Sequence, residues 1–150
     1  MILLASRTIN LHVDINSLFL YVTNMENYQE WFPGVINIQS ANDLNHGVIG
    51  KKYIEILEFP QGTQELLIEV KDLINNSTFV TEGDLEPIQP RMEMGFLKLN
   101  KTNCEFSLTY FCRNQSLNDG DEIITSITKD LSERIITACN NLKLILEGDD

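Results

Sequence analysis

Basic residues are scarce in this chain: Lys and Arg total 11 against 22 Asp and Glu, which gives a net charge of −11. Nucleic-acid phosphates bind to basic surfaces, so we expect no nucleic-acid partner. Anionic lipid surfaces also attract basic segments, so the charge disfavours binding to such a membrane. The charge suits instead a soluble protein whose copies repel one another.

Metal-ligand clusters and long apolar runs are also missing from the sequence. Cys104, Cys112 and Cys139 are widely spaced, and there is no CxxC motif or Cys/His cluster. This pattern argues against a structural zinc site, and we expect no cofactor. No apolar run approaches the roughly 18 residues of a transmembrane helix, and the N-terminus lacks the features of a signal peptide. With reduced thiols, these absences predict a cytoplasmic protein without stable membrane insertion.

The length of 150 residues favours a single domain over residues 1–150. Residues 2–13 alternate apolar and polar side chains as a β-strand does, although Arg7 interrupts the apolar face. Asp14 then stands at a helix N-cap position, with apolar residues at helical spacing after it. A second short helix fits residues 25–32, and a Pro-Gly pair ends it.

Six further strand candidates follow in succession. Short segments rich in Asn, Gly and Pro separate them, which predicts an antiparallel meander. The candidates are residues 35–41, 50–59, 63–74, 77–84, 90–99 and 103–113. The last two strands can both turn their apolar face inward only if the hairpin loop holds an odd number of residues, such as 100–102.

The last segment, residues 118–147, predicts one long amphipathic helix over residues 121–147. Its apolar side chains fall in one narrow stripe, and at about 1.5 Å per residue it would extend about 40 Å across a sheet. The sequence therefore predicts an α+β domain with a curved antiparallel sheet of about seven strands, two short helices and one long C-terminal helix. The space between sheet and helix is either filled by large side chains or left as a pocket.

Two motifs carry a family resemblance. Val22-Thr23-Asn24 stands before Trp31-Phe32-Pro33-Gly34, and Gly50-Lys51-Lys52-Tyr53 opens a strand. With the long terminal helix, this pattern resembles the polyketide cyclase/dehydrase and lipid-transport group of the START-like (Bet v 1-like, SRPBCC) superfamily. That group often has Asp where this chain has Asn24, and Trp where it has Tyr28. The resemblance implies the helix-grip fold and a function in ligand carriage, cyclisation, or chaperone or ribosome association.

The leading functional hypothesis is binding or carriage of a small lipophilic ligand, such as a lipid, isoprenoid or polyketide-like aromatic, in a cavity between the sheet and the long helix. The candidate lining is Trp31, Tyr53, Leu66, Ile68, Met92, Met94, Tyr110, Leu131 and Ile135. An ordinary interpretation as core packing is the alternative for Trp31, Tyr53, Met92, Met94 and Tyr110. Arg134 either extends past the sheet edge or forms a cation at the pocket mouth that pairs with a carboxylate head group.

Two other classes of function stay open. A polyketide cyclase or dehydratase would need inward acid-base groups, and convergence of Arg7, Tyr53, Glu55 or Tyr110 on one point would favour it. A protein-interaction domain would have a filled core and an exposed apolar patch.

No catalytic constellation is visible, and His12 and His46 are predicted to be surface residues without sequence-local partners. Ile136 and Leu144 point away from the apolar stripe of the long helix. They allow a weak homodimer as an alternative to a monomer.

Overall fold

The computed structural model describes residues 1–59 and 62–148, and seven strands form one sheet. The strands are β1 (Ile2–Leu11), β2 (Val35–Ser40), β3 (Lys52–Phe59), β4 (Gly62–Ile74), β5 (Thr78–Gly83), β6 (Pro90–Lys98) and β7 (Cys104–Cys112). Their spatial order is β1-β7-β6-β5-β4-β3-β2, and every neighbouring pair is antiparallel. The predicted meander is confirmed, with β1 added beside the last strand.

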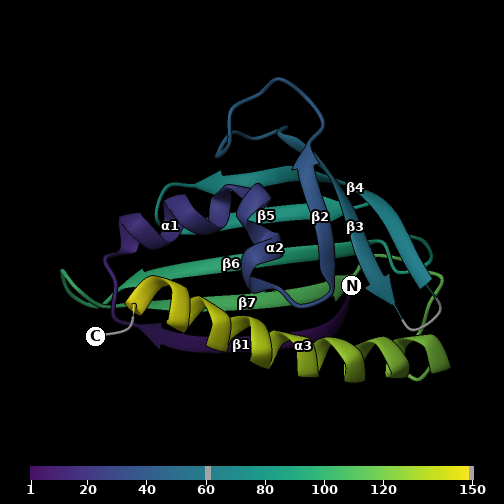
Figure 1. Cartoon of the computed structure of the whole chain (residues 1–150). Coiled ribbons are helices and arrows are strands. Elements are labelled where there is room, and N and C mark those ends of the chain that lie inside the picture. Colours follow the sequence, from purple (N-terminus) through teal and green to yellow (C-terminus); the bar gives the residue numbers. More distant parts are fainter. Residues whose placement is uncertain (60–61, 149–150) are drawn as a thin grey trace.

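The helices lie on one face of this curved sheet (Figure 1). They are α1 (Ile15–Thr23), the single-turn 3-10 helix η1 (Met25–Asn27), α2 (Tyr28–Trp31) and the long α3 (Glu122–Glu147). In Figure 1, α3 runs along β1 at one margin of the sheet, while α1 and α2 cross in front of its centre. The predicted α+β helix-grip architecture is confirmed.

The start of α1 follows from the Asp14 side chain. The backbone N–H of Ser17 donates to Asp14 Oδ2 at 2.9 Å, and the Ser17 hydroxyl donates to Asp14 Oδ1 at 2.7 Å. This is the predicted N-cap, because the carboxylate satisfies an amide that has no partner within the helix.

For the first residues of β1, the prediction of which side chains point into the core is wrong. Unbroken alternation over residues 2–13 puts Leu3 on the same side as the buried Ala5, but Leu3 is 56% exposed, while Leu4 is 2% exposed. A β-bulge shifts the pairing between β1 and β7 from Leu3 opposite Phe111 to Ala5 opposite Tyr110. The extra residue of a bulge reverses the alternation beyond it, which turns the side chain of Leu4 into the core.

The hairpin between β6 and β7 has the predicted parity. Met92 pairs with Tyr110 and Met94 with Leu108, and the Leu99 N–H donates to the Asn103 carbonyl at 3.1 Å around a three-residue loop. Both even-numbered faces therefore point towards the helices.

The corner after α2 is held by a long-range contact with α3. Gly34 has φ +90°, and its carbonyl accepts from the Glu58 N–H at 2.8 Å. Arg134 donates through Nη1 to the Pro33 carbonyl at 3.2 Å and through Nη2 to the Glu58 carbonyl at 2.8 Å. A Cβ on Gly34 would overlap Arg134 Nη1, so this corner needs glycine both for its backbone angle and for space.

We expect Gly34→Ala to lower the free energy of unfolding by about 2–4 kcal/mol, because a left-handed backbone strain of about 1–2 kcal/mol adds to the loss of Arg134 hydrogen bonds. Gly47→Ala is the matched control, because Gly47 also has positive φ but nothing within 4 Å of an added Cβ. It should cost only the strain. Equal losses for the two variants in urea unfolding would contradict this account of the corner.

Candidate functional site

An apolar cavity opens between the inner face of the sheet and the N-terminal half of α3. The empty volume is about 780 Å³, which includes the part open to solvent. The space that the centre of a water molecule can reach is about 100 Å³. A single water needs about 10–15 Å³ by that measure, so the cavity has room for a compact apolar group. The lining residues Phe59, Ile127 and Asp130 are only part-buried and mark its open side.

Six of the ten residues proposed from the sequence line this cavity. They come from β4, β6, β7 and α3: Leu66, Ile68, Met92, Tyr110, Leu131 and Arg134. Strand parity and the helical stripe identified them, because these patterns show which side chains face the space between the layers.

The other four, Trp31, Tyr53, Met94 and Ile135, lie outside the cavity lining. Trp31 is 1% exposed and contacts Tyr28 edge-on, with ring centroids 5.1 Å apart. Met94 and Ile135 are also fully packed in the core. Parity gives the direction of a side chain but not the point along the strand or helix where packing ends and empty space begins.

Several lining residues come from segments that the strand pattern does not cover. Met25, Tyr28 and Phe32 form a wall of the cavity from the helical corner, and Leu85 and Ile88 contribute from the connection before β6. The spacing of the first three places them on one helical face, and this signal could have identified them.

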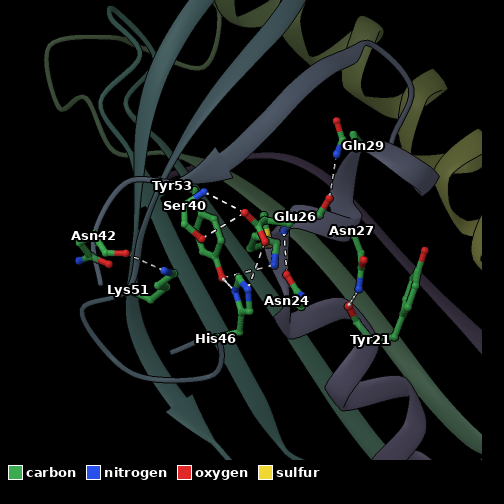
Figure 2. Close-up of polar contacts among 11 residues, drawn as sticks. Tyr21, Asn24, Glu26, Asn27, Gln29, Ser40, Asn42, His46, Lys51 and Tyr53 are labelled. Atoms are coloured by element: carbon green, nitrogen blue, oxygen red, sulfur yellow. Dashed lines mark hydrogen bonds and ion pairs between the residues drawn. The ribbon is translucent and has the colours of Figure 1, made fainter. Parts of the chain in front are cut away.

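Tyr53 belongs instead to a polar cluster at the first residues of β3 (Figure 2). Its hydroxyl lies 2.6 Å from His46 Nδ1 and accepts from the Met25 N–H at 3.4 Å. His46 Nε2 lies 3.3 Å from Glu26 Oε1, and the His46 and Tyr53 rings stack with centroids 5.7 Å apart. Burial raises the pKa of Tyr53 to about 12. His46 is exposed, as predicted for a surface residue, but it has two side-chain partners that the sequence did not indicate, because the connection from β2 to β3 folds back over Tyr53.

Glu55 follows on the same face of β3 and lines the cavity. It is 4% exposed, and none of the described residues donates a hydrogen bond to its carboxyl group. Burial raises its pKa to about 8, although the positive charge of Arg134 offsets part of that rise. A carboxyl group with this pKa carries its proton at neutral pH, which makes it an uncharged donor in an apolar space.

Arg134 is already engaged by the protein. Its Nε lies 2.9 Å from Asp130 Oδ2, its two terminal nitrogens donate to the Pro33 and Glu58 carbonyls, and its guanidinium lies over the Phe59 ring at 5.9 Å. Because every nitrogen has an acceptor, the structure does not leave this cation free for the carboxylate head group considered from the sequence. Its side chain fastens α3 over the open side of the cavity.

Two tyrosines complete the ionisable lining. The Tyr28 and Tyr110 hydroxyls are hydrogen-bonded to each other, and burial raises the pKa of both well above the ordinary value. Of the four acid-base candidates from the sequence, Glu55 and Tyr110 meet at the cavity, whereas Arg7 and Tyr53 do not. Within residues 1–59 and 62–148, no three His, Cys, Asp or Glu side chains gather closely enough to hold a metal ion.

No protein-family model and no curated protein sequence matches the chain. A START superfamily protein from Mycobacterium smegmatis superposes with a TM-score of 0.75 at 12% identity, over 97% of each chain. The Zhui aromatase/cyclase from Streptomyces sp. R1128 gives a TM-score of 0.68 at 9% identity, over 93% of this chain and 87% of that one. The di-domain ARO/CYC StfQ from the steffimycin biosynthetic pathway gives 0.70 at 11% identity, over 97% of this chain and 51% of that one.

These likenesses show that the chain has the START-like (Bet v 1-like, SRPBCC) helix-grip fold. The fold implied by the sequence resemblance is therefore confirmed. Among the described residues, no helix has both the length and the apolar character needed to cross a bilayer.

Glu55 should make stability depend on pH in a defined direction. Its pKa is raised from 4.5 to about 8 in the fold, so the stability it contributes is present below pH 4.5 and is lost as pH rises through 8. Between pH 5 and pH 8 we expect the wild type to lose roughly 3 kcal/mol relative to Glu55→Gln.

The measurement is the free energy of unfolding of both proteins in urea at each pH. Glu65→Gln removes an exposed carboxylate from β4 and controls for the loss of one negative charge. A constant difference between the wild type and Glu55→Gln across this range would show that the carboxyl group is not buried as described.

Proposed function

We propose that this protein binds or carries a small lipophilic ligand in the cavity between the sheet and α3. The observation that carries the proposal is the cavity itself: its walls are almost entirely apolar, and a buried carboxyl group without a protein partner faces into it. Apolar walls with a few polar anchors are typical of small-molecule sites.

The energetics of the walls support an apolar ligand. Leu66, Ile68, Met92 and Leu131 expose apolar surface to the cavity, and covering such surface is favourable by about 25 cal/mol per Å² before the entropy cost of binding. Tyr110 and Glu55 offer hydrogen bonds to a single polar group on the ligand. The START superfamily and aromatase/cyclase neighbours share this fold, which is consistent with a ligand cavity in this chain.

Filling the cavity should abolish binding. Leu131 lines the cavity, whereas Ile136 is 45% exposed on the outer side of the same helix. With Nile red as an uncharged lipophilic probe, we expect Leu131→Trp to weaken binding about tenfold or more and Ile136→Trp to leave it unchanged. Circular dichroism checks that both variants are folded. Unchanged binding by a folded Leu131→Trp protein would exclude this cavity as the site.

A second candidate function is that of a cyclase or dehydratase for a polyketide-like chain. The supporting observation is the acid-base set at the cavity, where Glu55 and a hydrogen-bonded pair of tyrosines line the same space. An ionised Glu55 would take a proton from a methylene between two carbonyls, and the new carbon–carbon bond would form as Tyr110 donates a proton to the attacked carbonyl oxygen.

This candidate predicts faster cyclisation of a linear poly-β-ketone thioester, followed by mass spectrometry. Glu55→Gln should lower the rate about a hundredfold or more while retaining Nile red binding. Absence of any acceleration by the wild type would remove the enzymatic candidate and leave carriage.

The cytoplasmic location and the monomeric or weakly dimeric state stay predictions of the proposal. Ile136 and Leu144 are exposed on α3, as expected for residues on the outer face of the helix, and Leu144 is 65% exposed.

A further inference from the structure

The ionisable groups that face the cavity differ in how far the protein itself satisfies them. They are Glu55 on β3, Tyr110 on β7, Tyr28 on α2, and Asp130 and Arg134 on α3. The tyrosines bind each other, and Asp130 and Arg134 form an ion pair. In the described lining, Glu55 is the ionisable group left without a hydrogen-bond partner, so a ligand can complete its interactions.

The chemistry of a buried carboxyl group selects among ligand head groups. An ammonium group would form a charge-assisted hydrogen bond with the carboxylate, which is stronger than a neutral bond and is strengthened by apolar surroundings. A ligand carboxylate would place two negative charges side by side. Arg134 does not reverse this preference, because Asp130 and two backbone carbonyls already take its donors.

The charge of the whole protein acts in the same direction. A net charge of −11 attracts cations and repels anions during association. A lipophilic cation is therefore favoured both during its approach to the protein and in the bound state, whereas a fatty acid is disfavoured at both stages.

We infer that the ligand class of this cavity is the lipophilic amines, with the apolar part of the ligand against Leu66, Met92 and Leu131 and its ammonium group paired with the Glu55 carboxylate. This inference rests on the proposed function and adds the chemistry of the head group. On binding, the proton of the Glu55 carboxyl group leaves to solvent, and the ammonium N–H donates to the resulting carboxylate.

The proton balance gives the inference a signature that general apolar binding lacks. Unliganded Glu55 is protonated at neutral pH, so binding of an ammonium ion should release about one proton at pH 7. Amine affinity should rise with pH up to about 8, where Glu55 is half ionised before the ligand arrives. An alcohol of the same shape should release no proton.

The test compares 2-naphthylmethylamine, 2-naphthylmethanol and 2-naphthoate by calorimetry at pH 7, in phosphate and in Tris to count released protons. We expect the amine to bind roughly ten- to a hundredfold more tightly than the alcohol, and the carboxylate most weakly. Glu55→Gln should reduce amine affinity to that of the alcohol for the same variant and remove the proton release.

Failure of this inference differs from failure of the proposed function. Equal affinities for the three compounds, or tightest binding of the carboxylate, would overturn the amine assignment while lipophile binding stands. The assignment is also overturned if the amine preference survives in Glu55→Gln. If none of the three compounds and no Nile red binds to the folded wild type, the proposed function fails as well.

Discussion

The Arg134 side chain is the contact on which the arrangement of the cavity depends. From the middle of α3 it reaches the corner after α2 through the Pro33 carbonyl and the end of β3 through the Glu58 carbonyl. Asn141, about two turns further along α3, adds a second link by donating to the Trp31 carbonyl at 3.1 Å. These bonds hold the helix over the sheet at a distance that leaves space beneath it. Gly34 permits them because it has no side chain at the point where the guanidinium lies.

The hydrogen bonds of Arg134 also explain why the Glu55 carboxyl group is left free to interact with a ligand. A cation beside a buried carboxylate would ordinarily pair with it and lower its pKa, but the guanidinium donates instead to Asp130 and to backbone carbonyls. Desolvation then dominates, and the Glu55 proton is retained near neutral pH. An unpaired buried carboxyl group destabilises a protein, so its presence in an apolar cavity is better explained by a ligand than by packing.

The sequence predicts the fold closely because each element has a local signal. The Asp14 cap, the strand alternation and the stripe on α3 were sufficient to order the elements, and parity predicted the pairing of Met92 with Tyr110. The cavity was harder to predict. A bulge turned Leu4 inward, which alternation cannot foresee, and His46 acquired Tyr53 as a partner through the folding of a long connection. Both depend on tertiary contacts rather than on periodicity.

The most direct test of this account is the ionisation of Glu55 in the free protein, followed by NMR through the ¹³C chemical shift of its side-chain carboxyl carbon. Glu55→Gln assigns the signal by its loss. We expect a titration midpoint near 8, since the carboxyl group is buried and none of the described residues donates a hydrogen bond to it. A midpoint near the ordinary value of 4.5 would contradict it, because the group would then be solvated or paired and could not distinguish an amine from other ligands.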